Sequence, residues 1–255
     1  NEMVERPVEI SVSHLVRTFG DFTAVANTSF TVQRGEVFGL LGPNGAGKTT
    51  TFRMLCGLLP VTSGDLRVAG VDVVKSRTAA RSNFGYVAQK FSLYGNLSVM
   101  ENLNFFAGVY GLHGQKKLDR IEAVIKEFRL NDVRDMIAGD LPGGYKQRLS
   151  MAAALMHEPK LIFLDEPTSC IDPLTRRNFW RQITSLSKRG TTIIITTHFM
   201  DESEYCDRIM IQDAGKLVVL GTPDEVRRIA GDENCTMDEA FISVILKKRE
   251  QEDDV

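Results

Sequence analysis

Glu36-Val37-Phe38-Gly39-Leu40-Leu41 leads without a break into Gly42-Pro43-Asn44-Gly45-Ala46-Gly47-Lys48-Thr49. The second stretch matches the phosphate-binding pattern GxxxxGK(S/T), with an apolar strand before it and a helix-compatible segment, Thr49–Leu55, after it. Glycines let the backbone wrap closely and point its N–H groups at phosphate oxygens, and the helix start adds about half a positive charge. Lys48 suits the β and γ phosphates, the Thr49 hydroxyl suits Mg²⁺, and Ala46 and Thr50 are further small residues. We therefore predict a nucleotide site here.

A second motif supplies carboxylates. The apolar run Leu161–Leu164 ends in Asp165 and Glu166. Asp165 sits where a ligand reaching Mg²⁺ through water belongs. Side chains alternate along a strand, so we expect Glu166 to point elsewhere and to orient or deprotonate a water molecule. Taken alone, Glu166 could equally be a solvated acid at a strand end.

The remaining pattern predicts an α/β fold with a P-loop NTPase (RecA-like) core. Residues 8–15 and 28–33 alternate apolar and polar, as the antiparallel strands of an N-terminal β-subdomain would. Residues 160–164 and 191–196 are continuous apolar runs typical of buried parallel strands. Between them, residues 92–159 show helical periodicity, in one stripe through Leu103, Phe106, Ala107 and Tyr110 and another through Ile121, Val124, Ile125 and Phe128. This stretch is predicted to be an inserted helical subdomain.

Length and composition limit the function classes. The chain has 255 residues, 43% hydrophobic and 25% charged, which is typical of a globular protein and excludes a disulfide scaffold or a disordered chain. A net charge of −2 argues against a bulk nucleic-acid binder. The four cysteines are widely spaced, which favours buried thiols in a reducing compartment. Because the chain begins with Asn1, we expect a piece of a longer polypeptide or a trimmed form.

The order of several motifs resembles the nucleotide-binding domain of ATP-binding cassette (ABC) transporters, over roughly residues 8–225. Besides the phosphate loop, Asp165 and Glu166, five further motifs of the family match. They are the aromatic residue before the loop (Phe19), the Q-loop glutamine (Gln89), the signature (Leu141-Pro142-Gly143-Gly144-Tyr145), the D-loop (Asp172) and the switch histidine (His198). The spacing from Gly144 to Asp165 and from Glu166 to His198 is usual for that family.

The resemblance implies a role for each residue. ATP would be bound by Phe19, stacking on adenine, by residues 42–50 and by Asp165. Mg²⁺ would be held by Thr49, Gln89 and, through water, Asp165, and catalysis would fall to Glu166, His198, Gln89 and Lys48. Without this context, Phe19 would be read as a core aromatic and His198 as a hydrogen-bonded structural histidine.

The signature departs from the family's LSGGQ pattern. Pro142 replaces a serine and Tyr145 replaces a glutamine, and Cys170 stands where the D-loop usually has a small residue. In the family two domains pair head to tail, and the signature serine binds the partner's γ-phosphate. Losing one hydrogen bond to a charged group costs about 1.5–3 kcal/mol. We therefore expect that the nucleotide site formed by this chain's own phosphate loop, Asp165 and Glu166 is competent. We expect the ATP site that its signature completes on the partner domain to be weakened.

The resemblance also implies an arrangement and partners. The whole chain would be a single ABC ATPase domain, with the core and β-subdomain in 1–91 and 160–225, the helical subdomain in 92–159 and a helical tail in 226–255, frayed from residue 250. Its partners would be a second nucleotide-binding domain, identical or an unlike tandem half, and membrane permease subunits that hold it at the cytoplasmic face of a membrane; no nucleic acid is expected.

Residues 91–112, 197–202 and 220–225 resemble the corresponding segments of drug- and lipid-exporter ATPases. Phe91 and Tyr94 could line the groove beside the Q-loop that receives the permease in this family, or they could equally belong to the core of the helical subdomain. The alternatives are an ABC-type ATPase acting on ribosomes or nucleic acid, a GTPase (although no NKxD motif occurs) and a regulatory half with a degenerate signature.

Overall fold

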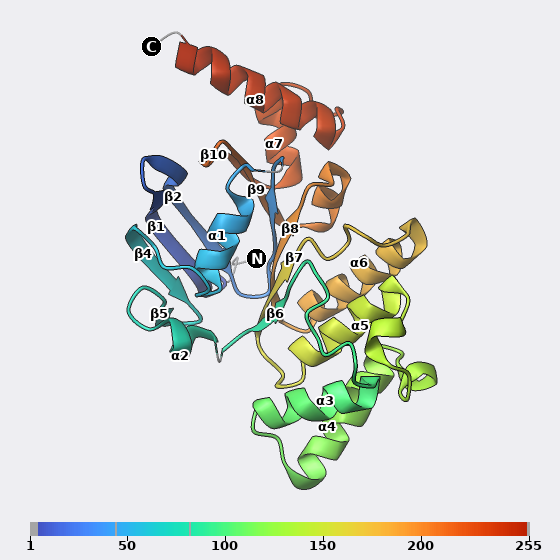
Figure 1. Cartoon of the computed structure of the whole chain (residues 1–255). Coiled ribbons are helices and arrows are strands. Elements are labelled where there is room, and N and C mark those ends of the chain that lie inside the picture. Colours follow the sequence, from blue (N-terminus) through green and yellow to red (C-terminus); the bar gives the residue numbers. More distant parts are fainter. Residues whose placement is uncertain (1–4, 44, 82, 254–255) are drawn as a thin grey trace.

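The computed structural model of the chain describes residues 5–43, 45–81 and 83–253. Asn44, one of the predicted nucleotide-binding residues, lies outside the described residues. The fold contains two sheets, with a helical layer beside the larger one and two helices near the C-terminus (Figure 1). This confirms the predicted α/β fold with a P-loop core, an N-terminal antiparallel β-subdomain and an inserted helical subdomain.

The β-subdomain is a four-stranded antiparallel sheet in the order β2-β1-β4-β5. Its strands are β1 (Val8–Phe19), β2 (Phe22–Gln33), β4 (Ser63–Val68) and β5 (Val71–Asp72). The predicted alternation is present in residues 10–15, because Ile10, Val12 and Leu15 are buried while Ser11, Ser13 and His14 are exposed or half-buried. These side chains share one apolar core with Phe38 and Phe52, which fixes the β-subdomain against the P-loop core.

The core sheet has six strands in the order β10-β9-β3-β8-β7-β6. Its strands are β3 (Val37–Leu41), β6 (Gly85–Val87), β7 (Leu161–Asp165), β8 (Thr192–Thr197), β9 (Arg208–Asp213) and β10 (Lys216–Gly221). All neighbours pair in parallel except β9 and β10, which form a hairpin. Strands β3, β7 and β8 are buried along their whole length, so their carboxyl ends are rigid supports for the site. Helices α1 (Lys48–Leu55), α2 (Arg77–Arg81) and α6 (Pro173–Lys188) follow strands of this fold.

The inserted subdomain consists of α3 (Val99–Val109), α4 (Gly114–Glu127) and α5 (Gly143–Ala154), with short 3-10 turns at Asn131–Val133 and Ala138–Asp140. Ser98 and Glu101 form a reciprocal capping box that starts α3. The second predicted stripe is buried throughout, whereas in the first only Leu103 and Ala107 are fully buried. Phe106 and Tyr110 remain half-buried because they face a groove.

The C-terminal part contains α7 (Pro223–Ala230) and α8 (Met237–Asp253). The prediction of a frayed tail from residue 250 is wrong for the described part, since α8 runs on to Asp253. Side-chain contacts to the β9–β10 hairpin hold this end: Lys216 Nζ pairs with Glu252 Oε1 at 2.7 Å, and Lys248 Nζ donates to the Leu217 carbonyl at 3.0 Å. Among the described residues, no helix is long and apolar enough to cross a membrane.

Candidate functional site

The phosphate loop lies between β3 and α1, and its backbone requires glycine at two positions. Gly42 has a φ of +154°, and a Cβ there would lie 2.3 Å from the Gln212 carbonyl oxygen. Gly47 caps α1 with a φ of +98°, and a Cβ there would lie 2.9 Å from the Ala24 carbonyl oxygen. The loop is therefore wedged between β2 and β9, and a side chain at either glycine would displace it.

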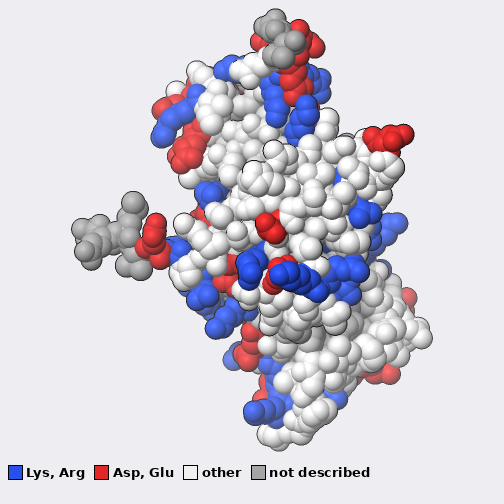
Figure 2. Space-filling model, turned by 90° about the vertical axis from the view of Figure 1, so that its left-hand side faces the viewer, with Lys and Arg blue, Asp and Glu red and all other residues white. Residues whose placement is uncertain are grey.

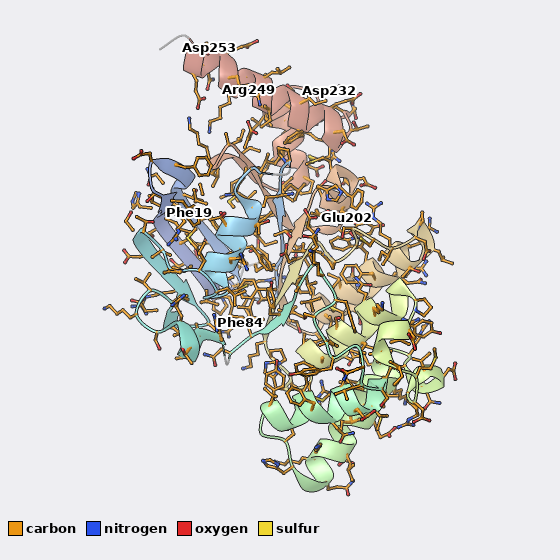
Figure 3. All side chains as sticks on the ribbon, viewed as in Figure 1. Phe19, Phe84, Glu202, Asp232, Arg249 and Asp253 are labelled. Carbon is orange, nitrogen blue, oxygen red and sulfur yellow. The ribbon has the colours of Figure 1, made fainter. Side chains whose placement is uncertain are left out.

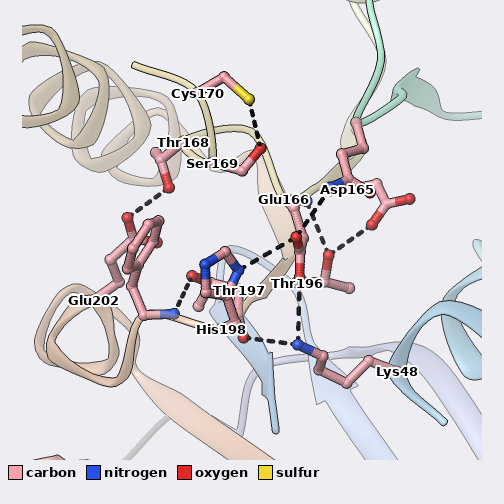
Figure 4. Close-up of polar contacts among 12 residues, drawn as sticks. Lys48, Asp165, Glu166, Thr168, Ser169, Cys170, Thr196, Thr197, His198 and Glu202 are labelled. Atoms are coloured by element: carbon pink, nitrogen blue, oxygen red, sulfur yellow. Dashed lines mark hydrogen bonds and ion pairs between the residues drawn. The ribbon is translucent and has the colours of Figure 1, made fainter. Parts of the chain in front are cut away.

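Lys48, at the end of this loop, forms an ion pair with Glu166. The Lys48 side chain is buried, and its Nζ donates to Glu166 Oε1 and to the Thr197 carbonyl, both at 3.3 Å (Figure 4). Burial lowers the pKa of Lys48, and the carboxylate of Glu166 opposes that shift. The pair joins the carboxyl ends of β7 and β8 to the start of α1, where phosphates are expected to bind.

Two further side chains converge on the same carboxylate. Gln89 Nε2 donates to Glu166 Oε2 at 3.2 Å. His198 Nδ1 lies 3.3 Å from the same oxygen (Figure 4). The Glu166 backbone has a φ of +42°, a left-handed conformation that is uncommon outside glycine. Its N–H donates to Thr196 Oγ1 at 2.9 Å, which holds the residue in place. The structure thus brings Lys48, Gln89, Glu166 and His198 together.

Asp165 lies on the other side of the strand end from Glu166. It is 8% exposed, and Thr196 Oγ1 donates to its Oδ1 at 2.8 Å. Burial raises the pKa of Asp165, and the hydrogen bond from Thr196 partly offsets this. The Asp165 carboxylate and the hydroxyl of Thr49, an exposed residue in the first turn of α1, are oxygen donors of the kind that suit Mg²⁺.

Phe19 lies at the end of β1, and it is 47% exposed rather than part of the core (Figure 3). Its ring carries the Arg17 guanidinium at 4.4 Å from the centroid. The same hairpin reaches the phosphate loop, because the Ala24 carbonyl abuts Gly47 and Ala26 N donates to the Gly215 carbonyl at 2.8 Å. The ring is thus available for stacking at this end of the β-subdomain.

The signature residues stand apart from that cluster. Leu141 is buried, Pro142 and Gly143 are exposed, and Gly143 is the first residue of α5. Pro142 is the N-cap with no side-chain cap, and a Cβ on Gly144 would lie 2.9 Å from Thr175 Cγ2. Within the described part of the chain, no hydrogen bond joins residues 141–145 to the Lys48–Glu166 cluster.

The D-loop aspartate begins α6. Asp172 Oδ1 accepts from Thr175 N at 2.9 Å and its Oδ2 from Thr175 Oγ1 at 2.6 Å, and these bonds lower the pKa of Asp172. Cys170, two residues earlier, is exposed, whereas Cys56 and Cys206 are buried as expected. The segment after Glu166 is tied to the signature helix, because Gln147 Nε2 donates to the Pro167 carbonyl at 2.7 Å.

A groove of about 320 Å³ separates the core from the helical subdomain. Neither Phe91 nor Tyr94 lines it, and Phe91 instead packs against the buried core that includes the helical subdomain, which is the other interpretation of this residue. Phe91 lies under Lys146 and Tyr94 packs on Phe105, because their segment turns back over α3 and α5. The lining comes from the segment after α1, from β6 and the residues that follow it, and from α3 and α5. It includes Leu58, Tyr86, Leu93, Phe106, Tyr110 and Ala153.

Sequence reasoning missed two groups near the site. Thr196 serves both Asp165 and the Glu166 amide, and its register opposite Asp165 in the parallel β7–β8 pair is the signal that could have revealed it. The buried Gln212 donates to Thr51 Oγ1 at 2.9 Å and supports the first turn of α1. No local pattern predicts that contact, since the two residues are far apart in the chain.

Comparison with known protein families identifies the family of the segment that carries the phosphate loop, the signature and the Asp165–Glu166 pair. The sequence profile of the ABC transporter family matches residues 25–169. The chain belongs to the ABC transporter family. It is an ATP-binding cassette of that family, and the matched residues contain its phosphate loop, its signature, and the carboxylates of Asp165 and Glu166.

Relatives support this membership. The probable multidrug ABC transporter ATP-binding protein YbhF of Escherichia coli is 53% identical over 239 residues, 92% of this chain but 41% of that protein. The chain therefore spans less than half the length of that relative. The linearmycin resistance ATP-binding protein LnrL of Bacillus subtilis is 40% identical, over 88% of this chain and 72% of that protein. The structure of cbiO1 from Clostridium perfringens, part of the ABC transporter complex cbiONQ, matches with a TM-score of 0.80 at 29% identity, over 87% of this chain and 91% of that one.

Proposed function

We propose that the chain binds and hydrolyses ATP to drive an ABC exporter, and that Glu166 acts on the attacking water. The observation that carries this proposal is the convergence of Lys48, Gln89 and His198 on the Glu166 carboxylate. General bases of this kind must lie within hydrogen-bond reach of the groups that orient them.

The contacts of the Glu166 carboxylate indicate which of its oxygens would act on water. Glu166 Oε1 is occupied by Lys48, and its Oε2 by Gln89 and His198. Phosphate oxygens attract Lys48 more strongly than one carboxylate does, because they carry more charge. When Lys48 turns to the phosphates, Oε1 becomes free to accept a proton from water while Gln89 and His198 keep the carboxylate in position.

Thr49, Gln89 and, through water, Asp165 would hold Mg²⁺ in this proposal. The bound ion would neutralise charge on the phosphates. Phe19 would stack on the adenine, in exchange for its contact with Arg17. Residues 42–50 would surround the phosphates with backbone N–H groups.

A second nucleotide-binding domain, either identical or an unlike half, would complete the site. The support is the exposed start of α5 at Pro142 and Gly143, which among the described residues makes no hydrogen bond to this chain's own Lys48–Glu166 cluster. The N–H groups at that helix start favour an anion, which here would be the γ-phosphate of the partner's ATP. Asp172, at the start of the neighbouring helix, would lie at the same interface.

Membrane permease subunits would hold the chain at the cytoplasmic face of a membrane and dock in the groove. Val87, Ala88 and Leu93 line this groove, and Gln89 lies between them and contacts Glu166. A segment inserted there would therefore move Gln89 directly. The names of YbhF and LnrL, which refer to multidrug transport and linearmycin resistance, support export over import.

The ribosomal or nucleic-acid alternative has less support. Figure 2 shows acidic and basic side chains interspersed on one face, rather than a continuous basic surface. The whole proposal is tested by measuring Mg²⁺-dependent phosphate release from ATP by the wild-type chain, with Lys48→Ala as control. Release that is absent in the wild type, or equal in the control, would refute it.

A further inference from the structure

A buried carboxylate lies just beyond the switch histidine. Glu202, in the 3-10 helix Met200–Tyr205, is 0% exposed (Figure 3). Its Oε1 accepts from Thr168 Oγ1 and from Arg176 Nε, both at 2.6 Å. Its Oε2 has no hydrogen-bond partner among the described residues. A charge this deeply buried requires a fixed counter-charge, and Arg176 is that counter-charge.

The Arg176 guanidinium makes two further contacts with the same short segment. Its Nη2 pairs with Asp201 Oδ1 at 2.7 Å, and its central carbon lies 4.6 Å from the centroid of the Phe199 ring. A planar guanidinium can serve two carboxylates and an aromatic face at once, which an ammonium group cannot do. The orientation of Phe199 is therefore fixed by Arg176.

Phe199 in turn packs on His198. The two ring centroids are 4.2 Å apart, with 35° between the ring planes. Phe199 N also donates to Thr197 Oγ1 at 3.0 Å, which anchors the backbone beside the histidine. His198 is 38% exposed on its other side, so this packing limits where its imidazole can point.

Arg176 belongs to the first turn of α6, which also contacts the signature. Asp172 caps that turn through Thr175, and the Thr175 methyl group occupies the space that a Cβ on Gly144 would enter. A movement of the signature helix would thus reach Arg176 through a single helical turn.

We propose that Arg176 is a positioning residue that sets the orientation of the His198 imidazole through Phe199 and the buried Glu202. The inference rests on the proposed ATP hydrolysis and adds a residue that touches neither ATP nor Glu166. It links the signature side of the chain to the catalytic side by direct contacts.

The test removes the guanidinium without leaving Glu202 unpaired. The double variant Arg176→Met, Glu202→Gln replaces the ion pair with neutral side chains of similar size, and Thr168 can still donate to the new amide oxygen. Arg181→Met, an exposed arginine on the same helix, is the matched control. Melting temperatures establish that all variants fold, and kcat and KM for ATP are measured with and without His198→Ala.

We expect the double variant to lose about tenfold or more in kcat, with KM changed by less than about twofold, because a small misplacement of a reacting group is costly. In the His198→Ala background the same double variant should change kcat by less than about twofold, because coupled residues are non-additive. Unchanged kcat in the first comparison, or an equal loss in both backgrounds, would overturn the inference. A wild-type chain that hydrolyses no ATP would instead reject the proposed function, and the inference with it.

Discussion

The substitution Pro142→Ser should strengthen ATP-driven pairing. Pro142 is the N-cap of α5, with φ −57° and ψ 154°, a backbone conformation that serine adopts readily as a cap. A serine hydroxyl there has two uses. In the free chain it caps the helix, a contribution of about 1 kcal/mol, and in the pair it binds a γ-phosphate, a contribution of about 1.5–3 kcal/mol. The cap bond uses the hydroxyl oxygen as acceptor and the phosphate bond uses its hydrogen as donor, so the two bonds are compatible. A pair of identical chains contains two signatures, so the gain is about 3–6 kcal/mol, or more than about a hundredfold in the dimerisation constant.

Light scattering over a concentration series with ATP measures this constant, in a Glu166→Gln background that preserves the nucleotide. Pro142→Ala is the control, because it removes the proline ring without adding a hydroxyl. Melting temperature shows independently whether the serine caps the helix. The reasoning is refuted if Pro142→Ser melts above Pro142→Ala but dimerises no more strongly than it or the parent.

Three further results are expected. Burial raises the pKa of Asp165, so the folded chain keeps the carboxyl proton at a pH where the unfolded chain has lost it. The buried carboxylate therefore lowers the free energy of unfolding as pH rises above the ordinary pKa of 3.8, and this loss of stability is present at pH 7. Asp165→Asn should therefore raise the melting temperature of the chain without nucleotide by a few degrees at pH 7, because a change of about 1 kcal/mol in the free energy of unfolding shifts the melting temperature of a domain of this size by about 2–4 °C. The same substitution should abolish Mg²⁺-dependent hydrolysis. A lower melting temperature in calorimetry would contradict the reasoning. Phe19→Ala should weaken ATP binding by about 1–3 kcal/mol in titration calorimetry and leave unfolding unchanged, because the ring is exposed; unchanged affinity would exclude stacking. Leu58→Asp places a charge in the groove and should release the chain from permease-containing membranes without loss of ATP binding. The control Leu118→Asp, at an exposed position on α4, should leave the chain bound to those membranes. Equal retention of the two variants would rule out docking in the groove.

The part of the site that sequence could predict is local. The glycine pattern between Leu41 and Lys48 could be predicted to matter, because at Gly42 and Gly47 the structure leaves no room for a side chain. Asp165 was placed correctly at a strand end because continuous apolar runs identify buried strands. Helical periodicity likewise identified the insert between the strands.

The part that sequence could not predict depends on distant contacts. Phe106 fits a buried stripe by spacing, yet its ring faces the groove, because α3 meets the core only along the other half of that stripe. The length of α8 depends on ion pairs with Lys216 and Asp213. The pairing of Arg176 with Glu202 joins residues on two separate elements, and each alone reads as a surface charge.

Single-turnover phosphate release by Glu166→Gln, beside ATP binding on the same sample, tests the central claim most directly. Glutamine keeps the size of the side chain but accepts no proton from water. The account predicts a loss of about 10²–10⁴-fold in the rate. It also predicts an ATP affinity that is unchanged or higher, because the neutral amide no longer competes with phosphate for Lys48. A variant that releases phosphate at a rate close to that of the wild type would contradict the assignment of Glu166 as the base.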